Sequence, residues 1–300
     1  MKFLCIGHIV YDTILPLNEF PKENKKHRAT EKVECGGGQA SNAAYLLGKW
    51  NADTYICGKC GDDFQGNKIK EEFESVSVNT KYLMFDKNTP TDCGYIFTNK
   101  LTSSRTIISY SKQKEDKSIP IEEKFDVILI DKSEPLTSLA ALKKNKDAIT
   151  IIDAERNTDE TIMLAHNVKY LVCSKNFAEE FTRKEINIQN ENNLIEIYDE
   201  IARTFKNQVV ITLEENGCFT KIGNDYKLIP SIKVYSKDTT AAGDIFHGAF
   251  AYFIANNYPY EEALYLSNIT GALSTTKVGG RYSVPELNDV LKVGGKIDII

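Results

Sequence analysis

Short apolar runs rich in β-branched residues alternate along this chain with longer segments in which apolar residues recur at helical spacing. The runs predicted to be strands are residues 3–6, 54–57, 127–130, 150–152, 170–173 and 209–212. The segments predicted to be helices are residues 42–50, 195–205, 243–255 and 261–273. Strands that alternate with helices favour a sheet covered on both faces, so the pattern predicts an α/β fold with a mostly parallel central sheet.

Two segments, residues 12–34 and 90–112, interrupt this order because polar and apolar residues alternate within them. The second segment predicts a hairpin of residues 95–97 and 106–108, with a turn near residues 102–104. We expect the two segments to form a small β-sheet outside the main core. Such a sheet would either cover a cleft as a lid or join a second copy in a homodimer.

The rest of the chain indicates one domain over residues 1–300, with this lid inserted, because no linker or repeat divides it. The net charge of −5 is too mild to indicate binding of nucleic acid or of an anionic membrane. No apolar run has the length of a membrane span and the apolar N-terminus has no cleavage site, so we expect a cytoplasmic protein. Cys57 and Cys60 form a C-x-x-C pair, expected in a loop, but no second ligand pair is spaced for zinc.

Residues 238–244, with the sequence Asp-Thr-Thr-Ala-Ala-Gly-Asp, predict a loop of small residues that opens a helix. Backbone N–H groups at a helix start are unpaired and lie at the positive end of the helix dipole, so an anion can bind there. Asp244 beside them would serve as a general base toward a hydroxyl, and phosphoryl transfer to an alcohol needs both features. The alternative is that Asp244 only caps the helix.

Glycines at positions 36–38 precede Gln39 and Asn42 at a second junction between a loop and a helix. The glycines let a polar ligand approach the backbone, and the two amides suit sugar hydroxyls, although a flexible capped turn would look the same. Asn176 and Glu179 share one face of a helical turn and would hold a hydrated Mg²⁺, unless they only start a helix. Neither G-x-G-x-x-G nor a Walker A pattern occurs, which argues against dinucleotide-binding and P-loop proteins.

Taken together, these segments resemble the ribokinase family of ATP-dependent sugar and nucleoside kinases, also called the PfkB family. The resemblance follows the same order along almost the whole chain. The segments that carry it are the first strand with Gly7 and Asp12, G-G-x-x-x-N-x-A at 37–44, G-K-x-G-x-D-x-x-G at 58–66, N-x-x-E at 176–179, T-x-G-x-x-G at 212–217, D-T-x-G-A-G-D at 238–244 and the tail at 277–285.

The resemblance implies a ribokinase-like three-layer domain that transfers the γ-phosphoryl group of ATP to a primary hydroxyl of a sugar. In that family pattern Asp244 is the catalytic base, and the amides of Ala241, Ala242 and Gly243 form the anion hole. The residues implied for the sugar are Asp12, Gly37, Gly38, Gln39, Asn42 and, from the lid, Arg105.

The resemblance also implies the ligands that accompany the sugar. Positions implied for ATP are Asn176, Thr212, Gly217, Gly243, Asn268 and Gly280. Mg²⁺ would be held through water by Asn176 and Glu179, and a monovalent cation such as K⁺ would lie near Asp238, Thr240 and Ser283.

Some residues depart from the family pattern, since Ala241 and Glu214 stand where glycine is usual. These two departures keep open a catalytically weak regulator that binds a sugar or a nucleotide. A nucleoside kinase of the same family is the other alternative, and its base pocket would use Tyr11, Tyr95 and Phe97. The identity of the sugar stays undetermined, because Gln39 differs from the Asn-type contact of ketohexokinase-like members.

Overall fold

The computed structural model describes residues 1–112 and 117–295, and the rest of the predicted domain lies outside these described residues. Within them the main sheet is nine-stranded, and its six strands expected from the sequence are confirmed. All neighbours in it pair in parallel except around β12. The order across the sheet is β13 (Asp225–Ile229), β12 (Cys218–Ile222), β11 (Gln208–Thr212), β10 (Tyr170–Ser174), β9 (Ile149–Ala154), β8 (Val127–Ile130), β1 (Lys2–Ile6), β4 (Asp53–Gly61) and β5 (Asn79–Asp86).

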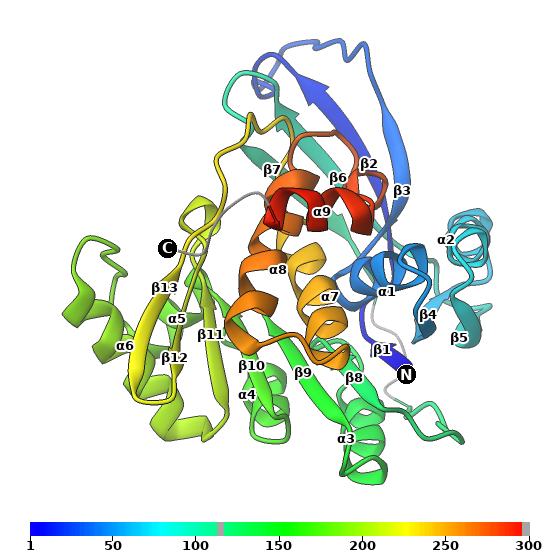
Figure 1. Ribbon diagram of the computed structural model, residues 1–300. Coiled ribbons are helices and arrows are strands. Elements are labelled where there is room, and N and C mark those ends of the chain that lie inside the picture. The colour runs from blue at the N-terminus through cyan, green and yellow to red at the C-terminus, as the bar shows by residue number, and fades with distance from the viewer. Residues whose placement is uncertain (113–116, 296–300) are drawn as a thin grey trace.

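Helices cover both faces of this sheet, as the alternation of apolar runs predicts (Figure 1). The chain alternates its side chains between two apolar cores, so Phe3 and Cys5 of β1 enter one core while Leu4 and Ile6 enter the other. The first core is covered by α1 (Gln39–Lys49), α2 (Phe64–Ser75), α7 (Ala242–Ala255), α8 (Tyr260–Ser274) and α9 (Leu287–Gly294). The second is covered by α3 (Pro135–Lys144), α4 (Asp159–Ala165), α5 (Lys175–Thr182) and α6 (Glu191–Phe205).

The Cys57–Cys60 pair lies inside β4 and not in a loop, so that part of the sequence prediction is wrong. The strand continues because its residues from Cys57 to Gly61, except Lys59, are buried as well. Residues three apart in a strand point to opposite faces, and accordingly Cys57 enters one core while Cys60 enters the other. The two thiols therefore cannot form one redox or metal site.

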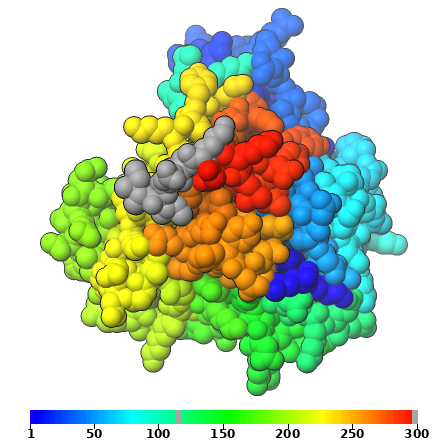
Figure 2. All heavy atoms as spheres, in the orientation of Figure 1, coloured from blue at the N-terminus to red at the C-terminus, as the bar shows by residue number. Residues whose placement is uncertain are grey.

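A second, four-stranded sheet stands at one end of the molecule, and we call it sheet B (Figure 1). The predicted hairpin is confirmed, with Tyr95 paired to Ile108 across β6 and β7. Figure 2 shows the yellow segment around residue 235 lying against sheet B, and the Ser103 hydroxyl donates to the Ser236 carbonyl at 2.7 Å. The order of sheet B is β3 (Val33–Gly37), β2 (Val10–Leu17), β6 (Asp92–Asn99) and β7 (Arg105–Tyr110).

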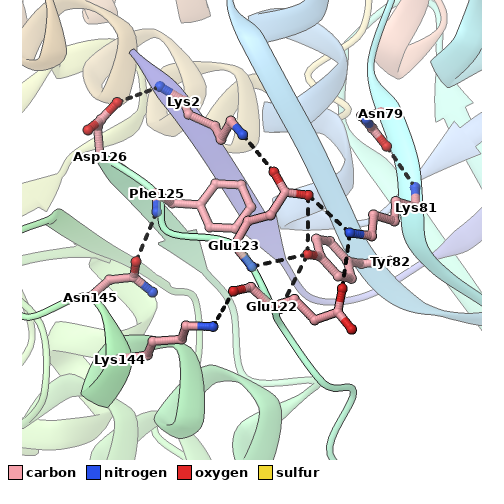
Figure 3. A network of polar contacts seen from close by, with 10 residues as sticks. All are labelled: Lys2, Asn79, Lys81, Tyr82, Glu122, Glu123, Phe125, Asp126, Lys144 and Asn145. Carbon is pink, nitrogen blue, oxygen red and sulfur yellow. Dashed lines mark hydrogen bonds and ion pairs between the residues drawn. The ribbon is translucent and has the colours of Figure 1, made fainter.

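Polar contacts hold the segment that leads from sheet B into β8 against the amino ends of the main strands (Figure 3). Glu123 accepts from Lys2 of β1 at 2.6 Å and from Lys81 of β5 at 3.2 Å. These two ammonium groups hold the pKa of Glu123 at about 2. The Asn145 carboxamide, just after α3, accepts from the Phe125 amide at 2.9 Å. The network thus stabilises the end of the sheet where the strands begin, opposite the carboxyl ends of the strands.

The order of the sheet also locates a ligand site. From β1 the sheet grows toward β4 and β5 on one side and toward β8, β9, β10 and β11 on the other, so β1 and β8 flank a topological switch point. Ligands in open α/β sheets bind beyond the carboxyl ends of the strands at such a point. In the described parts of the chain, no helix is both long and apolar enough to cross a bilayer.

Candidate active site

The start of α7 is open toward the carboxyl ends of the strands. The Ala242 amide donates to the Thr239 carbonyl at 3.3 Å, and regular helical bonding follows with the Ile245 amide to the Ala241 carbonyl at 2.9 Å. A Cβ atom built on Gly243 would meet nothing within 4 Å. The Ala242 N–H is thus bonded within the loop, while the space beside Gly243 is open, and an anion placed there would meet the positive end of the helix dipole.

The two residues that replace the usual glycines keep a glycine-like backbone. Ala241, which precedes α7, has φ 63°, and Glu214, the first residue of the 3-10 turn η1 (Glu214–Asn216), has φ 55°. Both values lie in the left-handed region, which costs a residue with a Cβ about 1–2 kcal/mol. The backbone at both positions therefore has a conformation that glycine adopts readily.

Asp244 lies in the first turn of α7, beside the second glycine-rich junction. Its Oδ2 accepts a hydrogen bond from Asn42 Nδ2 at 2.7 Å, so the structure brings these two predicted residues together. Burial raises the pKa of Asp244, while the Asn42 hydrogen bond and the charges of His247 and Arg105 oppose that rise. A carboxylate with a raised pKa is a better proton acceptor than an exposed one, which suits a general base.

Asp12 occupies a space that two glycines leave free on sheet B. A Cβ atom on Gly37 would lie 1.9 Å from Asp12 Oδ2, and one on Gly94 would lie 2.2 Å from Asp12 Oδ1. Burial raises the pKa of Asp12 to about 7, the nearby Asp244 charge adds to that rise, and Arg281 opposes it. The carboxylate is thus held between strands β3 and β6, available to accept hydrogen bonds from hydroxyl groups.

We expect Asp12→Asn to stabilise the protein more at pH 8 than at pH 5. The folded-state pKa of Asp12 lies above its unfolded value, so its contribution to stability is present below about pH 4 and is lost as the pH rises through about 7. The measurement is the difference in Tm between variant and wild type at pH 5 and pH 8. A difference that stays constant or shrinks as the pH rises would show that Asp12 is not desolvated as described.

The glycine loop is joined to the main sheet through a carboxylate that sequence reasoning missed. Gln39 Nε2 donates to Asp153 Oδ1 at 3.1 Å, and Asp153 Oδ2 lies 3.2 Å from His247 Nδ1. The same ring nitrogen lies 2.7 Å from the Gly243 carbonyl at the start of α7. A signal was present in the sequence, because Asp153 directly follows the apolar run 150–152 at the carboxyl end of a strand.

Sheet B contacts the loop that precedes α7. Arg105 Nη1 donates to the Thr239 carbonyl at 3.1 Å and to the Thr239 hydroxyl at 2.5 Å. Residue pairing places Arg105 opposite Thr98, and Asp12 opposite Gly94, so both side chains belong to one face of sheet B. By the same pairing Tyr11, Tyr95 and Phe97 belong to the other face, so these rings do not line a pocket with Asp12.

Other positions implied for the nucleotide lie at the end of β11, just after η1, in α8 and at the start of a second 3-10 turn. The Thr212 hydroxyl donates to the Cys173 carbonyl at 3.3 Å, and Gly217 has φ 93°. Gly280 opens the 3-10 turn η2 (Gly280–Ser283) with φ 45°. Asn268 is buried, and its Nδ2 donates to the Ile229 carbonyl at 3.0 Å, so this amide group holds the end of β13.

Two sets of residues bear on metal ions. Asn176 is exposed at the start of α5, and Glu179 accepts from the Ile186 amide at 2.9 Å while its side chain keeps 26% exposure. Amide and carboxylate oxygens with room for water fit a hydrated Mg²⁺.

The second set joins two loops directly. Asp238 Oδ1 accepts from the Thr240 amide at 2.9 Å and its hydroxyl at 2.6 Å, and Oδ2 accepts from the Gly279 amide at 3.1 Å. The Ser283 hydroxyl donates to the Gly280 carbonyl at 2.5 Å. These side chains are thus already engaged with the protein around the position implied for a monovalent cation.

The chain is similar to known proteins over almost its whole length. The profile of a family described as "pfkB family carbohydrate kinase" matches residues 1–287. Ribokinase of Bacillus subtilis is 25% identical over 97% of this chain and 98% of its own length. The structure of Arabidopsis thaliana ribokinase complexed with ribose and ATP superposes with a TM-score of 0.81 at 20% identity, covering 98% of each chain. A nucleoside kinase of Methanocaldococcus jannaschii superposes with a TM-score of 0.78 at 20% identity, covering 99% of this chain and 98% of that one.

Proposed function

Because the chain belongs to the pfkB family of carbohydrate kinases, we propose that it transfers the γ-phosphoryl group of ATP to a primary hydroxyl of a sugar. One observation carries this proposal: Asp244 stands in the first turn of α7, bonded to Asn42 at 2.7 Å, beside the open space at Gly243 of the helix start. The proposed base and the proposed anion site would then lie together, beside Asn42 at the start of α1. That combination matches the two demands of phosphoryl transfer to an alcohol.

In this proposal the sugar binds between sheet B and the glycine loop. Asp12 accepts hydrogen bonds from its hydroxyls, and Gly37, Gly38, Gln39 and Asn42 complete the binding surface. Asp244 takes the proton of the sugar's primary hydroxyl while the hydroxyl oxygen attacks the γ-phosphorus. The bond between the γ-phosphorus and the ADP oxygen breaks at the same time. The N–H groups of Ala241, Ala242 and Gly243 stabilise the negative charge on the transferring group.

The remaining implied residues hold the nucleotide and shield the reaction. ATP would lie along Thr212, Gly217, Asn268 and Gly280, and Mg²⁺ held by Asn176 and Glu179 through water would neutralise phosphate charge. Sheet B would act as a lid, because its Arg105 already contacts Thr239 beside the anion site. Exclusion of water protects ATP from hydrolysis, which a phosphotransferase with an open site would catalyse.

The test of this function is ADP release from Mg·ATP with ketoses, aldoses, deoxy-keto acids and nucleosides. We expect turnover with at least one sugar and none with nucleosides, since the rings of Tyr11, Tyr95 and Phe97 face away from Asp12. Preference for a nucleoside would replace the sugar kinase with the nucleoside kinase. Binding of ATP and a sugar without turnover would favour the regulator, whose support is the pair Ala241 and Glu214.

Sheet B also offers a surface for a second copy of this chain, and we propose a homodimer through it. Strand β7 ends the order of the sheet, and the outer face of β6 and β7 carries Tyr95, Ile108 and Tyr110 at 44%, 57% and 46% exposure. An unpaired edge beside apolar side chains favours association. Analytical ultracentrifugation should show a dimer in the wild type and a monomer in Ile108→Lys. A wild-type monomer at micromolar concentration would contradict the dimer without touching the kinase proposal.

A further inference from the structure

Arg281 lies in the 3-10 turn η2, yet its side chain is fully buried. Its exposure is 0%, and its guanidinium lies 4.6 Å from the centre of the Phe73 ring and 5.4 Å from that of Tyr45. A Cβ atom on Gly36 would lie 2.2 Å from Arg281 Nη1, so this glycine makes room for the charge. A buried arginine is tolerated only where an opposite charge and hydrogen bonds compensate it.

Glu72 of α2 supplies the opposite charge. Its Oε2 accepts from Arg281 Nη1 at 3.0 Å and from the Gly36 amide at 2.8 Å. Its Oε1 accepts from the Tyr282 hydroxyl at 3.0 Å. Glu72 thus joins α2, strand β3 and the turn η2, and it holds one end of the guanidinium.

The remaining N–H groups of Arg281 reach the start of α1. Nη2 donates to the Ser41 hydroxyl at 2.6 Å, and Nε donates to Asn42 Oδ1 at 3.4 Å. Arginine can only donate hydrogen bonds, so the carbonyl oxygen of the Asn42 amide must be the end that faces it. The NH₂ end must then point the other way, where its Nδ2 donates to Asp244 Oδ2 at 2.7 Å.

We propose that Arg281, anchored by Glu72, is a positioning residue that orients the Asn42 amide so that it donates to Asp244. The inference rests on the proposed function, in which Asp244 is the base. It adds two residues outside the site, Glu72 and Arg281, to the set that controls the reaction. The turn η2 and the start of α1 are thereby coupled to Asp244 through one line of hydrogen bonds.

Loss of this orientation has a direct consequence for Asp244. Without a donor toward its carboxylate, the ionised form loses stabilisation and its pKa rises further. Asp244 would then be protonated over a wider range of pH and would accept the hydroxyl proton less often. The other charged groups that face Asp244 or interact with it, and that stay in place, are Asp12, Arg105, Asp131, Asp153, Glu155 and His247.

The test uses the double variant Glu72→Gln/Arg281→Met, which removes both charges and so leaves neither buried alone. We expect the acidic limb of the kcat/KM profile to move up by about one pH unit, which is a tenfold loss at low pH. KM for ATP should stay within about twofold, because a pure change in protonation of the base leaves uniform binding intact. The ¹³C shift of the Asp244 carboxyl, assigned by its loss in Asp244→Asn, should titrate about one unit higher as well.

Two matched variants separate orientation from general loosening of the network. Tyr282→Phe removes the hydroxyl that bonds Glu72, and Ser41→Ala removes a contact of Arg281, while both leave the Arg281–Asn42 bond in place. Both should keep the wild-type pH profile. Arg281→Lys keeps the charge but lacks Nε, so it should resemble the double variant.

The proposal is overturned if the double variant folds and keeps the wild-type pH profile and carboxyl titration. It is also overturned if Tyr282→Phe and Ser41→Ala shift the profile as far as the double variant does. Failure of the proposed function would look different, because the wild type would then phosphorylate no sugar, or Asp244→Asn would retain turnover. The carboxyl titration does not depend on turnover and reports on the Arg281–Asn42 line in either case.

Discussion

Asp244→Asn should lower kcat about a thousandfold while sugar and ATP still bind with nearly wild-type affinity. A general base contributes about 10²–10⁴ in rate, and the amide cannot take the hydroxyl proton. The shape is conserved, so the Asn42 side chain, 2.7 Å from Oδ2 in the wild type, retains an oxygen to bond. Because the interaction that is removed acts in the transition state, kcat and kcat/KM should fall together.

The matched control for this variant is Asp153→Asn. Asp153 is a second buried carboxylate whose pKa is raised by burial, with Asp244 close enough to add to the rise, but it bonds Gln39 and not Asn42. Its loss should weaken sugar binding and leave kcat within about tenfold of the wild type. Calorimetric titration of sugar and ATP, with ADP release by both variants, decides the assignment. Equal losses of kcat in both variants, or near wild-type turnover in Asp244→Asn, would remove Asp244 as the base.

Gly37→Ala should raise KM for the sugar by about 10–100-fold, because the added methyl group displaces the Asp12 carboxylate. The new Cβ would lie 1.9 Å from Asp12 Oδ2, 2.7 Å from its Cγ and 3.2 Å from Val10 Cγ1. Asp12 must therefore turn away from the position in which we propose that it accepts the sugar hydroxyls. A hydrogen bond to a charged group is worth about 1.5–3 kcal/mol, which sets the expected range.

Gly295→Ala is the control, since its Cβ would meet only the Leu291 carbonyl at 3.4 Å. Gly295 also lies far along the chain from Gly37. Steady-state kinetics should show a raised KM for the sugar only in Gly37→Ala, with KM for ATP unchanged in both. Thermal unfolding should show that both variants are folded. Normal sugar binding by a folded Gly37→Ala protein would mean that Asp12 does not contact the sugar.

Much of the fold was accessible from local pattern. Each of the six strands expected from apolar runs is present, and the hairpin around residues 102–104 pairs as expected. Strands β5 and β13 at the edges of the sheet, and β12 beside β13, escaped prediction because their burial is partial and their apolar pattern is correspondingly weak. Strand β4 extends through Cys60 for the reverse reason, since Gly58 and Cys60 are buried although the local sequence looks like a turn.

The candidate site divides in a similar way. Residues near glycines at a helix start, such as Asp244 and Asn42, were predicted because small residues before a helix are a local signal. Asp153 follows an apolar run at the carboxyl end of a strand, a signal that the prediction did not use. Glu72 and Arg281 carry no local signal, since a charged side chain in sequence normally indicates a solvated surface. Only the burial of Arg281 and its ion pair with Glu72 distinguish these two from the other charged residues of the chain.

The amino-acid sequence by itself determined the α/β class, the order of its strands and helices, and the family, because these follow from periodicity and short glycine motifs along one stretch of chain. The tertiary structure alone decided which distant residues meet: β1 beside β8, Asn42 beside Asp244, and Arg281 beside Glu72. It also decided that Tyr11 faces away from Asp12's side of sheet B. Such contacts join residues many positions apart, and their geometry is set by how layers pack and strands register rather than by any local pattern.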